Sequence, residues 1–110
     1  MKLPLADRAI VPSEKITQYL LSRLHPVGRH KAAFFTAVGY CLEGWEEFAD
    51  DLVQHAIHNE VSTMEETRFG VRFAIEGILQ SPKGPRMIRS VWFIEDGEEL
   101  PRLVTAYPLE

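Results

Sequence analysis

The sequence predicts an α+β domain in which about three N-terminal helices pack on a C-terminal four-stranded antiparallel sheet. Apolar residues recur at helical spacing up to about residue 58 and at a spacing nearer two after it. The later segments are joined by short turns, which favour antiparallel neighbours. A chain of 110 residues with 45% hydrophobic residues has the size and composition of one globular unit. We therefore expect residues 1–110 to form a single α+β domain.

Three segments of the first half carry helix signals. Residues 12–23 begin with Pro-Ser, and their apolar side chains, Tyr19 among them, recur at helical spacing. Residues 29–38 follow a His-Pro-Val-Gly break and precede Gly39, where a left-handed cap is usual. Residues 45–58 place their apolar side chains on one face and their acidic ones on the other, which is typical of an amphipathic helix.

Four segments of the second half are expected to be strands. Residues 61–66 suit an edge strand, and residues 71–76 alternate between apolar and polar side chains. Gly77 is expected to mark a bulge in that second strand. Residues 87–94 are dense in β-branched and aromatic side chains, and residues 102–107 complete the sheet.

Charge is distributed unevenly along the chain, whose net charge is −4. Residues 1–40 carry six Lys and Arg against two acids, residues 41–66 carry eight acids and no Lys or Arg, and residues 67–110 carry six of each. The balance argues against a protein that coats nucleic acid generally, but a local basic site can still bind an anion. An ordinary solvated acidic helix beside unremarkable lysines is the alternative.

The composition favours a cytoplasmic protein. Cys41 is the only cysteine, so no internal disulfide can form, which fits a reducing compartment. No apolar run approaches the ~20 residues needed to span a bilayer. The first residues lack the long apolar core of a signal peptide.

The segment 25–31 offers a candidate anion site. It places Arg29, His30 and Lys31 at a helix start, where the positive end of the helix dipole disfavours cations. Free backbone N–H groups and cationic side chains together can bind phosphate or sulfate. Lys31 also continues the apolar stripe towards the core, so it needs a partner or a function. The alternative is that Lys31 runs along the surface and that His25-Pro26 forms a simple turn.

The last two strands offer a second set of polar side chains. In an ideal strand, Leu103, Thr105 and Tyr107 share one face, and Arg102 lies on the other with Val104 and Ala106. Arg89 lies centrally in the preceding strand, where a charge is unusual. Such a face beside a basic loop could position a phosphate and polarise a ribose hydroxyl. Alternatively, these residues are good strand formers and the arginines face water.

Familiar metal, cofactor and hydrolase motifs are missing from the sequence. The cysteine and histidines lack zinc-site spacing, and His55 and His58 are expected to be surface residues of one helix. There is no Gly-rich phosphate loop and no Gly-x-Ser-x-Gly elbow. We therefore expect neither a metal nor a cofactor.

Three stretches, LPLADRAIVP, HPVGRHKAAFF and VWFIEDGEELPRLVTAYPL, resemble a bacterial domain family of unknown function. That family occurs as small standalone proteins and at the C-termini of polymorphic toxins. The helices-then-sheet order and the RLVTAYP ending also resemble the barnase/EndoU/RelE-like ribonuclease superfold. These resemblances direct attention to six residues: His25, Arg29, Lys31, Arg102, Thr105 and Tyr107.

The leading hypothesis is metal-independent cleavage of RNA by attack of the ribose 2′-hydroxyl. That reaction needs a base, an acid and cations that stabilise the phosphorane. His25 and Tyr107 are the candidate proton-transfer groups, and Thr105 would orient the scissile group. The catalytic Lys31 would hold phosphate charge together with an anion-binding set comprising Arg29, His30, Arg89 and Arg102.

The alternative hypothesis is a non-catalytic interaction domain, or an inactive toxin relative, that binds a small antitoxin or immunity-like protein. The resemblance to toxin modules suggests it, and so does the acidic face over residues 43–51. Such a face could meet a basic partner and would speed association at low salt.

Overall fold

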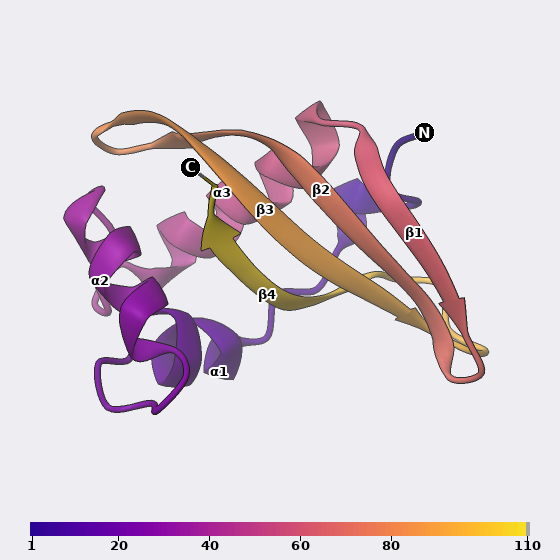
Figure 1. Ribbon diagram of the computed structural model, residues 1–110, viewed down its shortest axis with the longest axis horizontal. Coiled ribbons are helices and arrows are strands. Elements are labelled where there is room, and N and C mark those ends of the chain that lie inside the picture. The colour runs from indigo at the N-terminus through magenta and orange to yellow at the C-terminus, as the bar shows by residue number, and fades with distance from the viewer. Residues whose placement is uncertain (110) are drawn as a thin grey trace.

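A computed structural model describes residues 1–109 and confirms the α+β prediction (Figure 1). A 3₁₀ turn at Ala6–Arg8 precedes three helical segments and four strands. In chain order these are α1 (Ser13–Lys15) with a π-helical turn (Ile16–Leu20), α2 (Arg29–Ala37), α3 (Trp45–His58), β1 (Val61–Thr67), β2 (Gly70–Ser81), β3 (Gly84–Glu95) and β4 (Arg102–Pro108). Within residues 1–109, no helix is long and apolar enough to cross a membrane.

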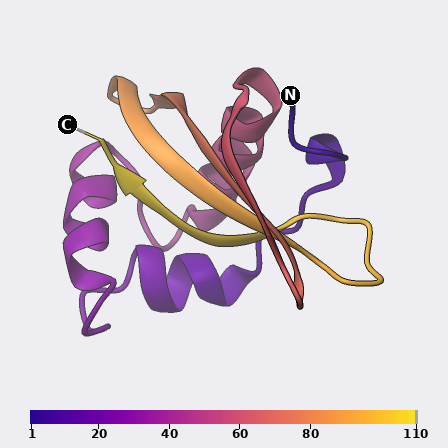
Figure 2. The same ribbon diagram turned by 45° about the vertical axis from the view of Figure 1, so that its right-hand side comes forward.

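The four strands form one antiparallel sheet in the order β1-β2-β3-β4. The β2–β3 hairpin is the longest part of the sheet, and its turn extends beyond the residue where β1 begins (Figure 1). Helix α3 crosses one face of the sheet, whereas α1 and α2 lie beside β4 (Figures 1 and 2). The N-terminal segment before α1 also joins the sheet, because Ile10 forms a parallel bridge with Arg102 at the start of β4.

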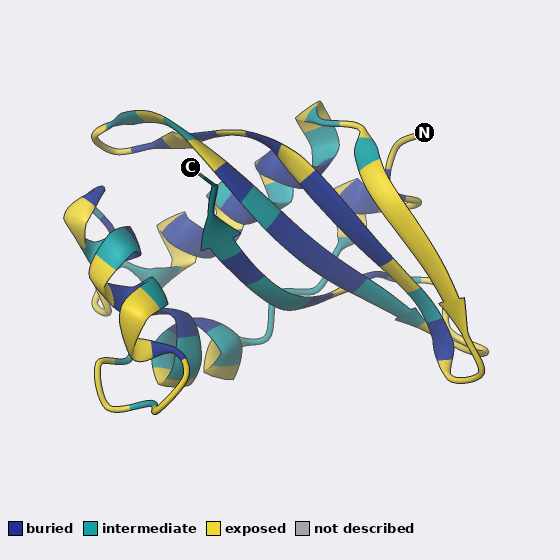
Figure 3. Ribbon diagram, viewed as in Figure 1, coloured by how far each residue is buried: buried dark blue, intermediate teal, exposed yellow. Residues whose placement is uncertain are grey.

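The core lies between the sheet and the helices. Trp92, Ile75 and Leu103 point into it from the strands, and Phe48 and Phe35 meet them from α3 and α2. The middle strands are therefore largely buried, and β1 is largely exposed (Figure 3). Burial of such side chains contributes about 1.5–3 kcal/mol each, so this one face supplies most of the stabilisation.

The first helix is shorter than residues 12–23. Its last turn is a π turn that the Leu21 N–H closes on the Ile16 carbonyl at 2.8 Å. The chain then folds back over the helix at Gly28, where a Cβ would lie 2.3 Å from the Tyr19 carbonyl oxygen. The helix ends early because the returning chain occupies the space beside its last turn. Isolated π turns are frequently found at functional sites.

The bulges lie elsewhere than at Gly77, which pairs with Ile88 in regular register. One bulge lies in β1 between Val61 and Thr63, and the other lies opposite the Val91–Trp92 step of β3. Gly77 is required for a different reason, because a Cβ there would lie 2.1 Å from the Asn59 side-chain oxygen.

The β4 bulge corrects the predicted faces of the last strand. Thr105 pairs with Val91 and Leu103 with Trp92, so Val104 is the extra residue. Leu103 and Ala106 consequently both enter the core. Thr105 and Tyr107 keep a shared face, but Leu103 does not share it. The bulge turns the hydroxyl pair away from the core.

Candidate active site

Three polar side chains from three separate elements meet beside β4. Lys31 of α2 donates hydrogen bonds to the Tyr19 hydroxyl in the π turn and to Thr105 Oγ1 in β4, the latter at 3.1 Å. The hydroxyl oxygens of Tyr19 and Thr105 lie 3.1 Å apart. All three side chains are partly buried. We call Tyr19, Lys31 and Thr105 the hydroxyl–lysine triad.

The ammonium of Lys31 is held by neutral groups. Its Nζ lies 4.8 Å from the centre of the Tyr19 ring and 5.7 Å from that of Tyr107, within the range of cation–π attraction. Over residues 1–109, no carboxylate lies within ion-pair distance of Lys31. The positive charge at this site is therefore not neutralised by an acid.

Tyr19 is electrostatically perturbed. Burial raises its pKa, but the hydrogen bonds to Lys31 and Thr105 and the charges of Lys31 and Lys15 outweigh that effect. The net result is a pKa of Tyr19 below its usual value. A phenol in this setting gives up its proton more readily than a free tyrosine does.

A pocket of about 670 Å³ opens beside the triad, large enough for a small-molecule ligand. Its lining residues come from α1, the π turn, the following loop and β4: Pro12, Glu14, Lys15, Gln18, Tyr19, His25, Val104 and Thr105. Two triad members thus form part of its wall, and Lys31 bonds to both of them.

His25 lines the same pocket and also closes the turn that precedes α2. Its ring lies edge-on to Tyr19, with 4.9 Å between ring centres. Its Nδ1 accepts hydrogen bonds from the N–H groups of Val27 and Gly28, at 3.0 and 2.9 Å. Neutral His25 therefore carries its proton on Nε2, as inferred from these bonds. In this arrangement Nε2 can donate a hydrogen bond, whereas protonation of Nδ1 would break the two bonds to Val27 and Gly28.

The same contacts alter the expected anion site at the start of α2. His25 occupies the N–H groups of Val27 and Gly28, and its carbonyl accepts from the Arg29 N–H at 3.1 Å. Arg29 and His30 are exposed and do not line the pocket. The cation that lines the pocket is Lys15. Lys31 points to β4 instead and bonds to the lining residues Tyr19 and Thr105.

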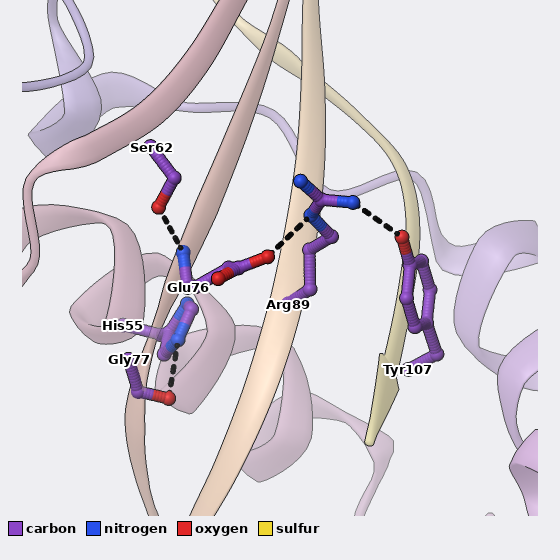
Figure 4. Close-up of polar contacts among 6 residues, drawn as sticks. All are labelled: His55, Ser62, Glu76, Gly77, Arg89 and Tyr107. Atoms are coloured by element: carbon purple, nitrogen blue, oxygen red, sulfur yellow. Dashed lines mark hydrogen bonds and ion pairs between the residues drawn. The ribbon is translucent and has the colours of Figure 1, made fainter. Parts of the chain in front are cut away.

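Arg89 and Tyr107 form a polar row across the outer face of the sheet (Figure 4). Arg89 Nη1 donates to the Tyr107 hydroxyl at 3.2 Å, and its Nε forms an ion pair with Glu76 at 3.2 Å. The ring of Tyr107 lies near Lys31, with 5.7 Å between the ring centre and Lys31 Nζ. Arg102 is placed apart from this row, exposed beside a smaller pocket that Glu95 and Glu98 also line.

The prediction that His55 lies on the surface is wrong. Its side chain is 2% exposed. Its Nε2 lies 3.1 Å from the Gly77 carbonyl (Figure 4), which makes Nε2 the donor and leaves Nδ1 to accept from Ser90 at 2.9 Å. Burial lowers the pKa of His55. His58, by contrast, is exposed.

Tyr19 is the site residue that sequence reasoning missed. Its position in an apolar stripe predicts a core residue. Its hydroxyl reaches the site only because the helix ends in a π turn and the chain folds back over Tyr19 at Gly28. The one available signal was a phenol hydroxyl within a stripe otherwise made of aliphatic side chains. In the described part of the chain, no three His, Cys, Asp or Glu side chains gather as a metal site.

Residues 2–110 match the family model of DUF6883, a domain of unknown function. The chain belongs to this family. The DUF6883 fold is similar to a chain of a contact-dependent growth inhibition toxin–immunity protein complex from Klebsiella pneumoniae 342. The TM-score is 0.72 at 15% identity, covering 92% of this chain and 100% of the other. Among curated proteins, none matches the sequence.

These comparisons confirm the predicted membership of a domain family of unknown function. At 15% identity the structural likeness concerns the fold alone. Roles for the residues of this DUF6883 domain therefore have to be argued from its own geometry.

Proposed function

We propose that this DUF6883 domain cleaves RNA without a metal, through attack of a ribose 2′-hydroxyl on the adjacent phosphate. The observation that carries the proposal is the hydroxyl–lysine triad, in which Tyr19 and Thr105 line the 670 Å³ pocket and Lys31 bonds to both of them. It combines a phenol of lowered pKa with an ammonium that no carboxylate of residues 1–109 neutralises. The reaction requires both a proton acceptor and a cation beside the phosphate.

Attack begins at Tyr19. Its phenolate takes the proton of the 2′-hydroxyl, and the freed oxygen bonds to phosphorus. Lys31 stabilises the phenolate beforehand, because its Nζ donates to the Tyr19 oxygen. It would stabilise the phosphorane afterwards if the phosphate binds between Tyr19 and Thr105, both of which Lys31 contacts. Thr105 orients the scissile phosphate, and His25 donates from Nε2 to a phosphate oxygen. This assigns His25 to binding rather than to proton transfer, since its Nδ1 is already occupied.

The leaving 5′-oxygen also needs a proton. We assign this role to Tyr107, whose ring centre lies 5.7 Å from Lys31 Nζ, just outside the pocket lining. Its hydroxyl oxygen accepts from Arg89, so its own proton remains free to be donated. Arg89 would then stabilise the tyrosinate that forms. The products are a 2′,3′-cyclic phosphate and a 5′-hydroxyl, with no water consumed in this step.

Two further observations support the proposal. The N-terminal 40 residues carry a local excess of positive charge that suits a polyanion. The fold is similar to a chain of a toxin–immunity protein complex, and RNA cleavage is an activity suited to a toxin. We propose the cytoplasm, where RNA is abundant, as the place of action.

The test incubates purified protein with end-labelled RNA in EDTA at several pH values. We expect cleavage that leaves cyclic phosphate ends, and Tyr19→Phe should lower the rate by at least about 100-fold, the usual contribution of a general base. Arg102→Met is the matched control, because Arg102 is exposed and lines a different pocket. Intact RNA at high protein concentration, or equal rates for wild type and Tyr19→Phe, would overturn the proposal.

A second candidate function is the binding of a small partner protein, with the domain either inactive or held inactive by that partner. The favouring observation is that the similar chain comes from a toxin–immunity protein complex. Purification of the tagged domain from its native cells tests it. A stoichiometric partner released by salt supports it, whereas recovery of free monomer alone removes it.

A further inference from the structure

The second strand continues well past its partner at one edge of the sheet. The β1–β2 ladder runs from Thr67↔Gly70 to Val61↔Ile75, and β2 then continues to Ser81 (Figure 1). The hydroxyl of Ser62, in the β1 bulge, closes the ladder by accepting from the Glu76 N–H at 3.0 Å. Residues 76–81 therefore pair with β3 on one side only.

The backbone direction at this edge follows from the Glu76 contact. Its N–H points away from β3, and β2 pairs with β3 without a bulge. Alternate residues of a strand point the same way, so Ile78 and Gln80 also direct their N–H and C=O groups outward. The Ile78 carbonyl receives Asn59 Nδ2 at 3.4 Å, which agrees with that direction. Within residues 1–109, the Ile78 N–H and both Gln80 backbone groups lack a partner.

A groove of about 230 Å³ lies beside this edge. Its lining comes from α3, the residue after it and β2: Asp51, Gln54, His55, His58, Asn59, Ile78 and Gln80. Ile78 and its cross-strand neighbour Met87 are 41% and 43% exposed. Strand edges are usually protected by a lysine, a proline or a bulge, and residues 76–81 contain none of these.

The charge around the groove selects the occupant. Among residues 1–109, the groove lining includes the carboxylate of Asp51 and no Lys or Arg. The stretch of chain that contains α3, residues 41–66, carries eight acids and no Lys or Arg. We propose that this edge binds an extended, lysine- or arginine-bearing segment of a partner protein. The segment would pair as an added strand with residues 76–81 of β2, which lie beyond the β1–β2 ladder. Backbone hydrogen bonds would give affinity and the acidic helix would select basic side chains. The proposal rests on the partner-binding function and not on RNA cleavage, whose pocket lies at the β4 edge.

The probe is a capped seven-residue peptide of alternating lysine and valine, followed by amide NMR. The amides of Ile78 and Gln80 should shift on titration and exchange more slowly with solvent in the complex. Gln80→Pro removes one outward donor and should weaken binding about fivefold, the usual net effect of one hydrogen bond. Gln80→Thr keeps that donor and is the matched control. A glutamate–valine peptide should bind more weakly than the lysine–valine one.

Three outcomes overturn the proposal: equal binding of the acidic peptide, equal binding by Gln80→Pro and Gln80→Thr, or shifts confined to other strands. If Gln80→Pro does not fold, a lysine–valine peptide N-methylated along one edge replaces it, and full retention of binding then contradicts strand addition. A native partner that binds Gln80→Pro as tightly as wild type would show that partner binding stands and this surface is wrong. RNA cleavage by Gln80→Pro should be unchanged.

Discussion

Lys31 Nζ lies 3.1 Å from Thr105 Oγ1, although the two residues are 74 positions apart in the chain. This contact joins the start of α2 to the bulged half of β4, and Tyr19 completes it from the π turn. Among residues 1–109, no acid forms an ion pair with Lys31. Such a lysine contributes little to folding, because the desolvation of its charge offsets its hydrogen bonds. Residues that break local rules without a structural benefit tend to mark functional sites.

Lys31→Met should therefore fold with nearly unchanged stability and lose function. The loss of a cation–π contact worth about 0.5–1 kcal/mol is offset because the variant removes a charge from a helix start. We expect the Tm in sulfate-free buffer to equal or slightly exceed that of wild type. Sulfate should raise the Tm of wild type only, and RNA cleavage should disappear.

The control for this variant is Arg29→Met, which removes an exposed cation from the same helix start. It should keep the sulfate response, since Arg29 does not line the pocket. If Lys31→Met melts well below wild type without sulfate, Lys31 is a structural residue and the anion-site argument fails.

Tyr19 should ionise at a lower pH than Tyr40. Lys31 and Thr105 lower its pKa against the effect of burial, whereas burial and the Asp51 carboxylate raise the pKa of Tyr40. Ultraviolet titration should show an early phenolate step that is missing in Tyr19→Phe and shifted to higher pH in Lys31→Met. RNA cleavage should rise through the same step. An early step that survives in Tyr19→Phe would assign the ionisation to another residue.

The fold class could be predicted from the sequence because apolar side chains recur with a clear helical or strand period along it. The stripe over residues 45–58 became α3 with the predicted bounds, and the alternation at residues 71–76 became the first half of β2. The first helix was less predictable, since its end depends on the chain returning over Tyr19 at Gly28. Periodicity describes one segment at a time and does not register such a long-range contact.

The site was predictable only in part for the same reason. Lys31 and Thr105 were both anticipated, and their types and positions were informative by themselves. Their partner Tyr19 was not, because a tyrosine in an apolar stripe is normally a core residue. The prediction for His55 was wrong in the opposite sense, because a residue expected on the surface is buried. Its acceptor is a backbone carbonyl at Gly77, and no side-chain pattern reveals such a carbonyl.

The buried His55 should make folding sensitive to acid. Its pKa is lowered in the folded protein from a usual value of 6.5, so the unfolded chain binds its proton first as pH falls. Stability is then fully present above about pH 6.5 and decreases below it. The expected loss by pH 5.5 is at most about 1.4 kcal/mol. Urea unfolding at pH 7.5 and 5.5 measures it.

His55→Gln is the comparison for that measurement. It should lower stability at pH 7.5 by about 1–3 kcal/mol, because the Gly77 carbonyl and Ser90 lose a well-placed partner. The difference between wild type and His55→Gln should then shrink at pH 5.5. A difference that stays constant between the two pH values would show that His55 titrates normally in the folded protein.

Gly77→Ala should destabilise the domain through Asn59 rather than through the backbone of β2. The three atoms nearest to an added Cβ all belong to the Asn59 side chain, at 2.1, 2.3 and 2.9 Å. That side chain donates to the His55 carbonyl at 2.9 Å and so caps the end of α3. Displacing it should cost about 1–3 kcal/mol, which covers the lost hydrogen bond and the repacking.

A double-mutant cycle with Asn59→Ala tests this cause. Asn59→Ala alone should lose about 1 kcal/mol, the usual worth of its hydrogen bond, and it also empties the space that the added methyl group needs. Gly77→Ala should then be nearly neutral in the Asn59→Ala background, because alanine lowers the entropy of the unfolded chain. The two substitutions would therefore be strongly non-additive in urea unfolding. Additive losses would instead place the strain in the β2 backbone, where regular pairing with Ile88 gives no sign of it.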